Sequence, residues 1–212
     1  MLFRSTATAV LQKPLALLPG AKIIPFSVPE DVWDGHDTGD QWSIYGDGRI
    51  LDSLGAEVPS NWGTLDIGKT DNSTADLNRQ ILNGLRQSDI DVLYTDGRIT
   101  TTDYIDASHT VSMQADTGMS LGLKQSVTRI HGETRILPIY DFNSGEAGNN
   151  LEYNIVRWGV VTVVDSNWQG SMNTDVITEK SYDYHGELRP NPDLSSTTGY
   201  IEGAYTSPVL VE

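Results

Sequence analysis

One stretch of this chain constrains the fold more than any other, residues 152–164, where Val160, Val161, Val163 and Val164 surround Thr162. Such β-branched side chains pack well on a pleated sheet and favour an extended strand. The apolar part of the stretch is interrupted by an arginine and is shorter than the about 20 residues that span a bilayer. A buried strand is therefore expected at the centre of a sheet, and residues 176–184 are expected to pair with it antiparallel after a turn.

The clearest helix signal begins at Ser73, whose hydroxyl can accept a free backbone N–H of a first helical turn. Asp76 follows three residues later, which is the spacing of a capping box and is favoured by the helix dipole. Leu77, Ile81 and Leu85 then recur on one helical face. This stripe predicts an amphipathic helix that packs on the sheet.

A second helix is predicted over residues 118–130, because apolar side chains recur there at helical spacing and Gly132 can supply the left-handed C-terminal residue. Residues 135–140 are predicted to form another strand. The expected fold class is α+β, with an antiparallel or mixed β-sheet, two short amphipathic helices packed on it, and many loops.

The 212 residues suffice for one domain, which is expected over residues 21–184. Residues 185–212 are rich in Pro, Ser, Thr and Gly and are expected to form a polar C-terminal tail. Residues 1–20 are interpreted as a truncated or artefactual remnant, because residues 1–5 match the translated end of a common sequencing adapter. On this interpretation the native N-terminus lies upstream.

The charge and composition exclude several functional classes. The 29 acidic against 14 basic residues leave a net charge of −15, and such a surface repels the phosphates of nucleic acids. The absence of cysteine excludes disulfides, thiolate nucleophiles and cysteine-ligated zinc. No nucleic-acid partner is expected.

Metal ligands are the weakest of the candidate features. No two histidines have the spacing of a metal-binding motif. The four histidines are His36, His109, His131 and His185. Two acidic stretches are weak calcium candidates, one made of Asp34, Asp37 and Asp40, the other of Asp141, Asn143 and Glu152. The second departs from a calcium-loop pattern, since its glycine lies one position early, and ordinary solvated loops explain both stretches. No cofactor is assigned, with calcium as the open alternative.

Sequence signatures of catalysis are not found. The chain has no Gly-x-Ser-x-Gly elbow, no Ser-x-x-Lys and no phosphate-binding glycine loop. A non-enzymatic protein is therefore expected, with a hydrolase as the remaining enzymatic hypothesis.

Two blocks of sequence resemble a known family. The first block holds Asn61, Gly63, Asp66, Gly68, Asn72, Ser73 and Asp76, followed by Arg79-Gln80-Ile81 and Gly84. The second holds residues 135–140, then Gly148, Asn149 and Asn150, then Tyr153-Asn154-Ile155-Val156 and Trp158-Gly159-Val160. Together they resemble the C-terminal exported region of TadE/TadG-like proteins of the Flp (tight-adherence) pilus-assembly system. The chain departs from that pattern at Thr174 and Asp175, where basic residues are expected.

The resemblance implies a structural or assembly domain that lies outside the cytoplasmic membrane. A transmembrane helix upstream of this chain would anchor it, and other pilus-assembly or envelope proteins would be its partners. The first block would form a strand entry and fix the start of the helix, while Asn149 and Asn150 would satisfy backbone groups at the mouth of the central strand. The alternative is an extracellular, calcium-assisted binding or adhesion module.

Overall fold

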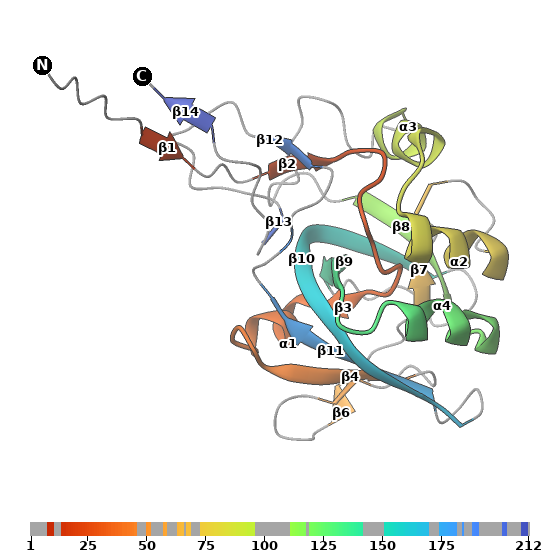
Figure 1. Ribbon diagram of the computed structural model, residues 1–212. Coiled ribbons are helices and arrows are strands. Elements are labelled where there is room, and N and C mark those ends of the chain that lie inside the picture. Colours follow the sequence, from red (N-terminus) through yellow and green to blue (C-terminus); the bar gives the residue numbers. More distant parts are fainter. Residues whose placement is uncertain are drawn as a thin grey trace, which may run out of the picture.

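A computed structural model of the chain shows an α+β fold, in which a mixed, curled six-strand sheet forms a half-barrel with a few short helices (Figure 1). The six described strands with three or more residues are β4 (Gln41–Tyr45), β7 (Gly63–Leu65), β8 (Val111–Thr117), β9 (Thr134–Asp141), β10 (Leu151–Trp168) and β11 (Thr174–Lys180). Four two-residue strands bring the number of described paired strands to ten, and two of these pair in parallel, which makes the sheet mixed. The structure describes residues 8–10, 14–45, 50–51, 57–58, 63–65, 67–68, 73–95, 111–117, 119–141, 151–169, 174–181, 184, 188–190, 201–202 and 209–211. The predicted fold class is confirmed.

Strand β10 is the axis of the sheet. Along one edge it pairs antiparallel with β9. Along the other edge it pairs with β8 through Leu151–Ile155, with the short parallel strand β13 (Ile201–Glu202) through Trp158 and Gly159, and with β11 from Val161 onward. The predicted central strand and its antiparallel neighbour are therefore confirmed.

The sheet curls because the segment before α1 bridges its two sides. Strand β3 (Val28–Pro29) runs parallel to β9, and Ile23 pairs with Ile136 in the same direction. Phe26 then pairs with Thr64 of β7, while Leu65 N donates to Pro25 O at 2.9 Å. Since β7 pairs with β8 and β8 with β10, the backbone pairings run in a continuous circuit.

Short strands extend the sheet and link the chain ends. Strands β5 (Ile50–Leu51) and β6 (Glu57–Val58) continue from β4. Apart from this sheet, β1 (Thr8–Val10) pairs with β14 (Val209–Val211), and β2 (Pro14–Leu17) pairs with β12 (Leu188–Pro190) (Figure 1). The predicted tail thus contributes three short strands to pairings with other parts of the chain.

The helices are short and pack around the sheet. They are α1 (Glu30–Asp34), α2 (Thr74–Asn83), α3 (Gln87–Thr95), the 3-10 turn η1 (Leu121–Leu123) and α4 (Lys124–Arg129). The predicted start of the first helix is confirmed, because the Ser73 hydroxyl accepts from Asp76 N. The helix predicted over residues 118–130 begins instead at residue 121, because Ser120 is extended and its hydroxyl accepts from Gly122 N. Gly132 has a φ of 78°, as expected beyond its end. None of the described helices is long and apolar enough to cross a membrane.

Two clusters of buried apolar side chains lie on the two faces of the sheet. One includes Tyr153, Ile155, Trp158 and Val160 of β10; the other lies under α1, α2 and α4 and includes Val161. The register of β10 shifts between Ile155 and Arg157. This bulge changes the alternation, so that odd residues before it and even residues after it face the same cluster.

Tyr140 and Tyr153 stack inside the first cluster, with ring centroids 4.3 Å apart. Burial raises the pKa of the Tyr153 phenol above its ordinary value. The phenol therefore stays protonated at neutral pH and acts as part of the core.

Candidate functional site

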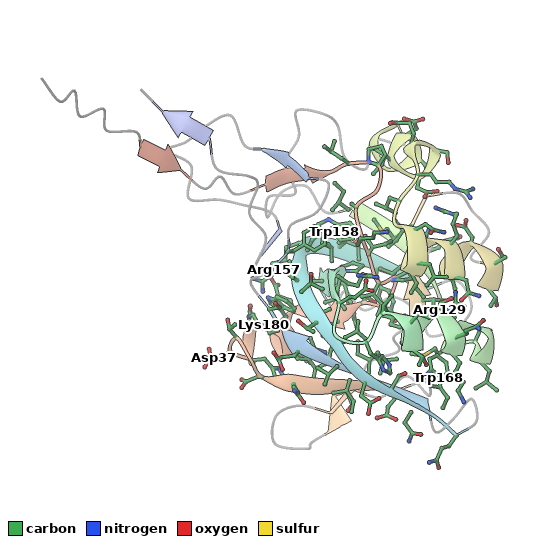
Figure 2. The ribbon with its side chains drawn as sticks, in the orientation of Figure 1. Asp37, Arg129, Arg157, Trp158, Trp168 and Lys180 are labelled. Carbon is green, nitrogen blue, oxygen red and sulfur yellow. The ribbon has the colours of Figure 1, made fainter. Side chains whose placement is uncertain are left out.

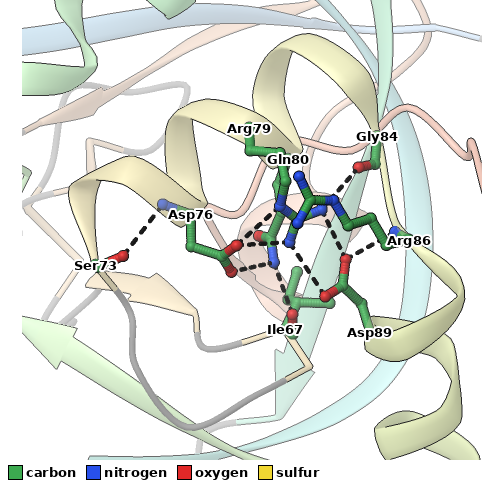
Figure 3. Close-up of polar contacts among 8 residues, drawn as sticks. All are labelled: Ile67, Ser73, Asp76, Arg79, Gln80, Gly84, Arg86 and Asp89. Carbon is green, nitrogen blue, oxygen red and sulfur yellow. Dashed lines mark hydrogen bonds and ion pairs between the residues drawn. The ribbon is translucent and has the colours of Figure 1, made fainter.

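Five described residues of the first family-like block converge with Asp89 on the junction of α2 and α3. We call this group the α2–α3 clamp, and it consists of Gly68, Asp76, Arg79, Gln80, Gly84 and Asp89. Figure 3 shows all of these residues except Gly68. The Ser73 cap fixes the first turn of α2 and so places Asp76 toward the clamp.

Arg79 is the centre of the clamp. Its Nε donates to Asp76 Oδ1 at 2.8 Å, and its Nη1 lies 2.8 Å from Asp89 Oδ2. Nη1 also donates to the backbone oxygen of Gly84, the residue that follows α2, at 3.3 Å. The side chains of Arg79 and Asp89 are only 10% and 5% exposed, so the two charges balance each other in a largely dry setting.

The electrostatics of the clamp favour the charged arginine. Burial by itself lowers the pKa of the Arg79 guanidinium, but hydrogen bonds to Asp89 and then Asp76 outweigh burial and raise that pKa above its ordinary value. Arg79 is therefore a fixed cation, which suits a structural ion pair and does not suit proton transfer.

Asp89 and Gln80 extend the clamp to the backbone. Asp89 Oδ2 accepts from Arg86 N at 2.7 Å and so caps the first turn of α3. Gln80 Nε2 donates to Ile67 O at 2.7 Å and to Asp76 Oδ2 at 3.3 Å. The clamp therefore joins two helices and the segment that follows β7 (Figure 3).

Two glycines allow the close approaches around the clamp. Gly68 has a φ of 111°, and a Cβ there would lie 2.9 Å from Asp89 Cα. Gly84 has a φ of 79°, and its Cβ would lie 2.6 Å from Gly20 O. Both positions combine a left-handed backbone with contact to another segment, so any side chain would strain them.

The other residues of the family-like blocks lie elsewhere. Gly63 begins β7 and pairs with Thr117. The following predicted residues lie outside the described part of the chain: Asn61, Asp66, Asn72, Gly148, Asn149 and Asn150. The sequence did not indicate Asp89, because its partner Arg79 lies ten residues away across a helix junction.

The first acidic stretch is occupied by interactions within the protein. Arg157, which is labelled in Figure 2, forms ion pairs with Asp34 and with Glu30, the latter at 3.3 Å. Asp40 Oδ2 accepts from Asp37 N at 2.8 Å, which closes the loop after α1. These bonds make Asp34 and Asp40 part of local structure.

The second acidic stretch is only partly described. Asp141 is exposed at the end of β9, Asn143 lies outside the described residues, and Glu152 lies on β10. Within the described ranges, no three or more Asp, Glu or His side chains come together as a metal site.

Lys180 connects α1 to the sheet, and the sequence did not predict this role. Its Nζ donates to Trp33 O at 3.2 Å and His36 O at 3.0 Å, and it lies 4.5 Å from the centroid of the Trp33 ring. His36 Nδ1 lies 2.6 Å from Val32 O and therefore donates to it. Both side chains are buried, so Lys180 caps the C-terminal carbonyls of α1 and His36 is part of the core.

A serine, a histidine and an aspartate also meet near the end of β10. His131 Nε2 lies 2.9 Å from Ser166 Oγ, while His131 Nδ1 lies 3.8 Å from Asp165 Oδ1. The second distance is too long for a hydrogen bond, and Asp165 is 67% exposed. Asp165 Oδ1 instead accepts from Ser166 N, and Trp168 Nε1 donates to Ser166 Oγ.

This arrangement differs from a hydrolytic triad in the group that should orient the histidine. In a working triad a buried carboxylate holds the imidazole in one tautomer and stabilises its protonated form. At 3.8 Å, and 67% exposed, Asp165 makes no hydrogen bond that would hold the ring. The cluster instead ties the turn after α4 to β10. His131 lies 34 or more residues before the other members, so no local motif indicates the cluster.

Comparisons with protein families, with curated proteins and with solved structures found no match to this chain.

Proposed function

We propose that this chain is a non-enzymatic structural domain of a TadE/TadG-like protein that takes part in Flp pilus assembly. The domain lies outside the cytoplasmic membrane, and a transmembrane helix encoded upstream anchors it. Its partners are other pilus-assembly or envelope proteins.

The α2–α3 clamp carries this proposal. The clamp has six residues, and five of them belong to the first family-like block. Its polar side chains bind one another and the backbone rather than facing a binding site. Catalytic residues face a space that can hold a substrate. The clamp residues form internal ion pairs and caps, which is what a scaffold requires.

The acidic surface supports the same assignment. A net charge of −15 keeps a protein soluble and disfavours contact with anionic lipid head groups and nucleic acids. The chain would therefore contact partners through shape and backbone pairing more than through a charged binding site.

Deletion of the gene in the cell that encodes it tests the proposal. Surface pili are counted by electron microscopy in the parent, in the deletion strain, and in the deletion strain carrying the full-length gene. Loss of pili that the full-length gene restores supports the assembly role. Unchanged pili in the deletion strain would contradict it.

The membrane anchor has its own test. The native gene upstream of Met1 is sequenced, and an in-frame apolar helix of about 20 residues is expected. A tag on this domain should then be cleaved by protease added to spheroplasts. A protected tag, or an upstream region without such a helix, would contradict the proposed location.

A further inference from the structure

The chain holds a single Asn-Gly pair, Asn83-Gly84, and this pair lies at the junction of α2 and α3. Asn-Gly is the dipeptide most prone to spontaneous deamidation, because glycine has no side chain that hinders the approach of its backbone nitrogen to the asparagine side chain. Asn83 is the last residue of α2, and it is exposed to water. The pair therefore has the chemistry of a self-modification site.

The reaction at such a pair needs only water. The Gly84 nitrogen loses its proton to solvent and attacks Asn83 Cγ, which closes a succinimide ring and releases the side-chain amide as ammonia. Water then opens the ring at either carbonyl and leaves aspartate or isoaspartate. In isoaspartate the chain runs through the former side chain, so the backbone is longer by a methylene group.

The structure holds the two reacting groups apart. Gly84 N donates to Gln80 O at 2.9 Å, so the attacking nitrogen is occupied by the last hydrogen bond of α2. Ring closure also needs a ψ at Asn83 that differs from the helical value of about −42°. The last turn of α2 therefore has to open before the reaction can start.

The α2–α3 clamp and a neighbouring segment hold that turn closed. Arg79 Nη1 donates to Gly84 O at 3.3 Å (Figure 3). Leu85 N donates to Ala21 O at 3.0 Å, and Gly20 N donates to Leu85 O at 2.7 Å. A Cβ on Gly84 would lie 2.5 Å from Ala21 O, so the backbones are in close contact. The end of α2 has to separate from residues 20–21 before the turn can open.

We propose that Asn83 is a self-modification site whose deamidation the α2–α3 clamp holds back, so that the reaction marks copies in which the clamp has opened. The rate follows the population of the locally open state, as for other reactions of protected groups. Isoaspartate lengthens the backbone before Gly84, so the bonds from Gly84 to Gln80 and Arg79 cannot both re-form. The mark is therefore one-way, and it does not depend on the proposed role in pilus assembly.

Trypsin provides a direct measurement, because cleavage after Arg79 and Arg86 releases residues 80–86 as one peptide. The folded chain is incubated at mildly alkaline pH and digested briefly, and the asparagine, aspartate and isoaspartate peptides are quantified by chromatography with mass spectrometry. A synthetic peptide of the same residues and the chain in urea give the unprotected rates. The folded chain should react at least about tenfold more slowly, which corresponds to an opening free energy of about 1.4 kcal/mol. Equal rates would overturn the proposal.

Variants at Arg79 test whether the clamp is the cause of the protection. Arg79→Lys keeps the charge but loses the planar fork that reaches two carboxylates and the Gly84 carbonyl together, so its Asn83 should deamidate faster. Arg79→Met should react faster still. Lys124→Met, at an exposed position of α4, is the matched control and should react at the wild-type rate.

Circular dichroism establishes which variants are folded under the conditions of the assay. Arg79→Lys decides the matter if Arg79→Met does not fold. A folded Arg79 variant that deamidates at the wild-type rate would show that the clamp does not protect the site. Asn83→Gln should give no product at this position, because glutamine closes a larger ring far more slowly.

The one-way mark has its own test. Deamidated copies gain a negative charge and are separated from the parent chain by anion exchange. They should unfold at a lower urea concentration than the Asn83→Asp variant, which adds the same charge without lengthening the backbone. Equal midpoints would show that the clamp re-forms around isoaspartate, and the mark would not be one-way.

Discussion

Single atoms decide how closely α1 packs on the central strand. Gly159 faces Trp33, and an added Cβ would lie within 2.8 Å of three carbons of the indole. Trp33 itself is fully buried, and its ring packs edge-on to Trp42 with centroids 5.8 Å apart. A glycine is therefore required at this point of an otherwise β-branched strand.

Gly159→Ala is expected to destabilise the protein by about 1–3 kcal/mol, because overpacking forces the Trp33 ring or the strand to shift. Urea unfolding measures the change. In a Trp33→Leu background the added methyl group has room, so the same substitution should cost less there. An equal cost in both backgrounds would show that the contact with Trp33 is not the cause.

Two other glycines have positive φ and differ in what an added side chain would meet. Gly132 has a φ of 78°, and a Cβ there would meet nothing within 4 Å. Gly132→Ala should cost about 1–2 kcal/mol for the backbone conformation alone. Gly84→Ala should cost more than that, because a φ of 79° with a ψ of −171° is open almost only to glycine and its Cβ would also meet the Gly20 and Ala21 carbonyls. Thermal unfolding of both variants makes the comparison, and equal costs would contradict it.

Asp175 connects stability to pH. Burial, and then repulsion by Asp165, raise the pKa of the Asp175 carboxyl above its ordinary value of 3.8 although a hydrogen bond with Asn167 opposes them. The folded state therefore holds this proton more tightly than the unfolded state does. Stability from this group is present below pH 3.8 and is lost as pH rises from there through the folded pKa.

Asp175→Asn should accordingly stabilise the protein at neutral pH, and the difference from wild type should vanish in acid. Unfolding curves recorded across the acidic range test this. Asp165→Asn removes the repulsion that raises the pKa of Asp175. The stability of this variant should therefore fall less than that of the wild type as the pH rises. A stabilisation by Asp175→Asn that grows as the pH falls would contradict this prediction. The family-like pattern has a basic residue expected at position 175. A basic side chain there would be attracted by Asp165 rather than repelled by it.

At the scale of elements, strong local signals predicted structure well and weak ones did not. The Ser73 cap, the pair Leu77 and Ile81 on α2 and the β-branched run of β10 each depend on neighbouring residues, so the sequence predicted them. The extension of the α2 stripe to Leu85 was wrong, because α2 ends at Asn83 and Leu85 packs in the first cluster. Helix α3 was missed, because Ser88, Asp89 and Asp91 have low helix propensity and the helix is fixed by Asp89 and the buried Ile90. Strand β8 was also missed, since its pairing partners β7 and β10 lie far away in the chain.

The contact between α1 and β11 was also missed, because it joins residues that are far apart in the chain. Helix α1 has five residues, too few to be stable alone. Lys180 fixes its end through two carbonyls, although it lies 144 residues after His36. No local pattern could have indicated that contact.

Lys180→Met is expected to destabilise the protein by about 1–3 kcal/mol, because two buried carbonyls lose a charged donor. Lys124, which is exposed on α4, provides the matched control. Lys124→Met should change the free energy of unfolding by less than about 0.5 kcal/mol. Equal effects of the two substitutions on urea unfolding would contradict the role of Lys180.

At the scale of the whole molecule, the curl of the sheet was beyond prediction. In the structure, residues 22–29 pair with β9 on one side and with β7 on the other, which the sequence did not indicate. Such pairings are non-local, and their register depends on the complete fold. The resemblance indicated five of the six clamp residues but not Asp89.

The whole account depends on the clamp being structural, and the Arg79–Asp89 pair provides the most direct test. A double-mutant cycle with Arg79→Met and Asp89→Asn is measured by urea unfolding. Each single variant should lose about 3–5 kcal/mol, because it leaves one largely buried charge without its partner. The double variant should lose less than the sum, with a coupling of about 0.5–3 kcal/mol. Single variants that fall within about 0.5 kcal/mol of wild type would show that these residues do not hold the fold together, and the scaffold interpretation would be wrong.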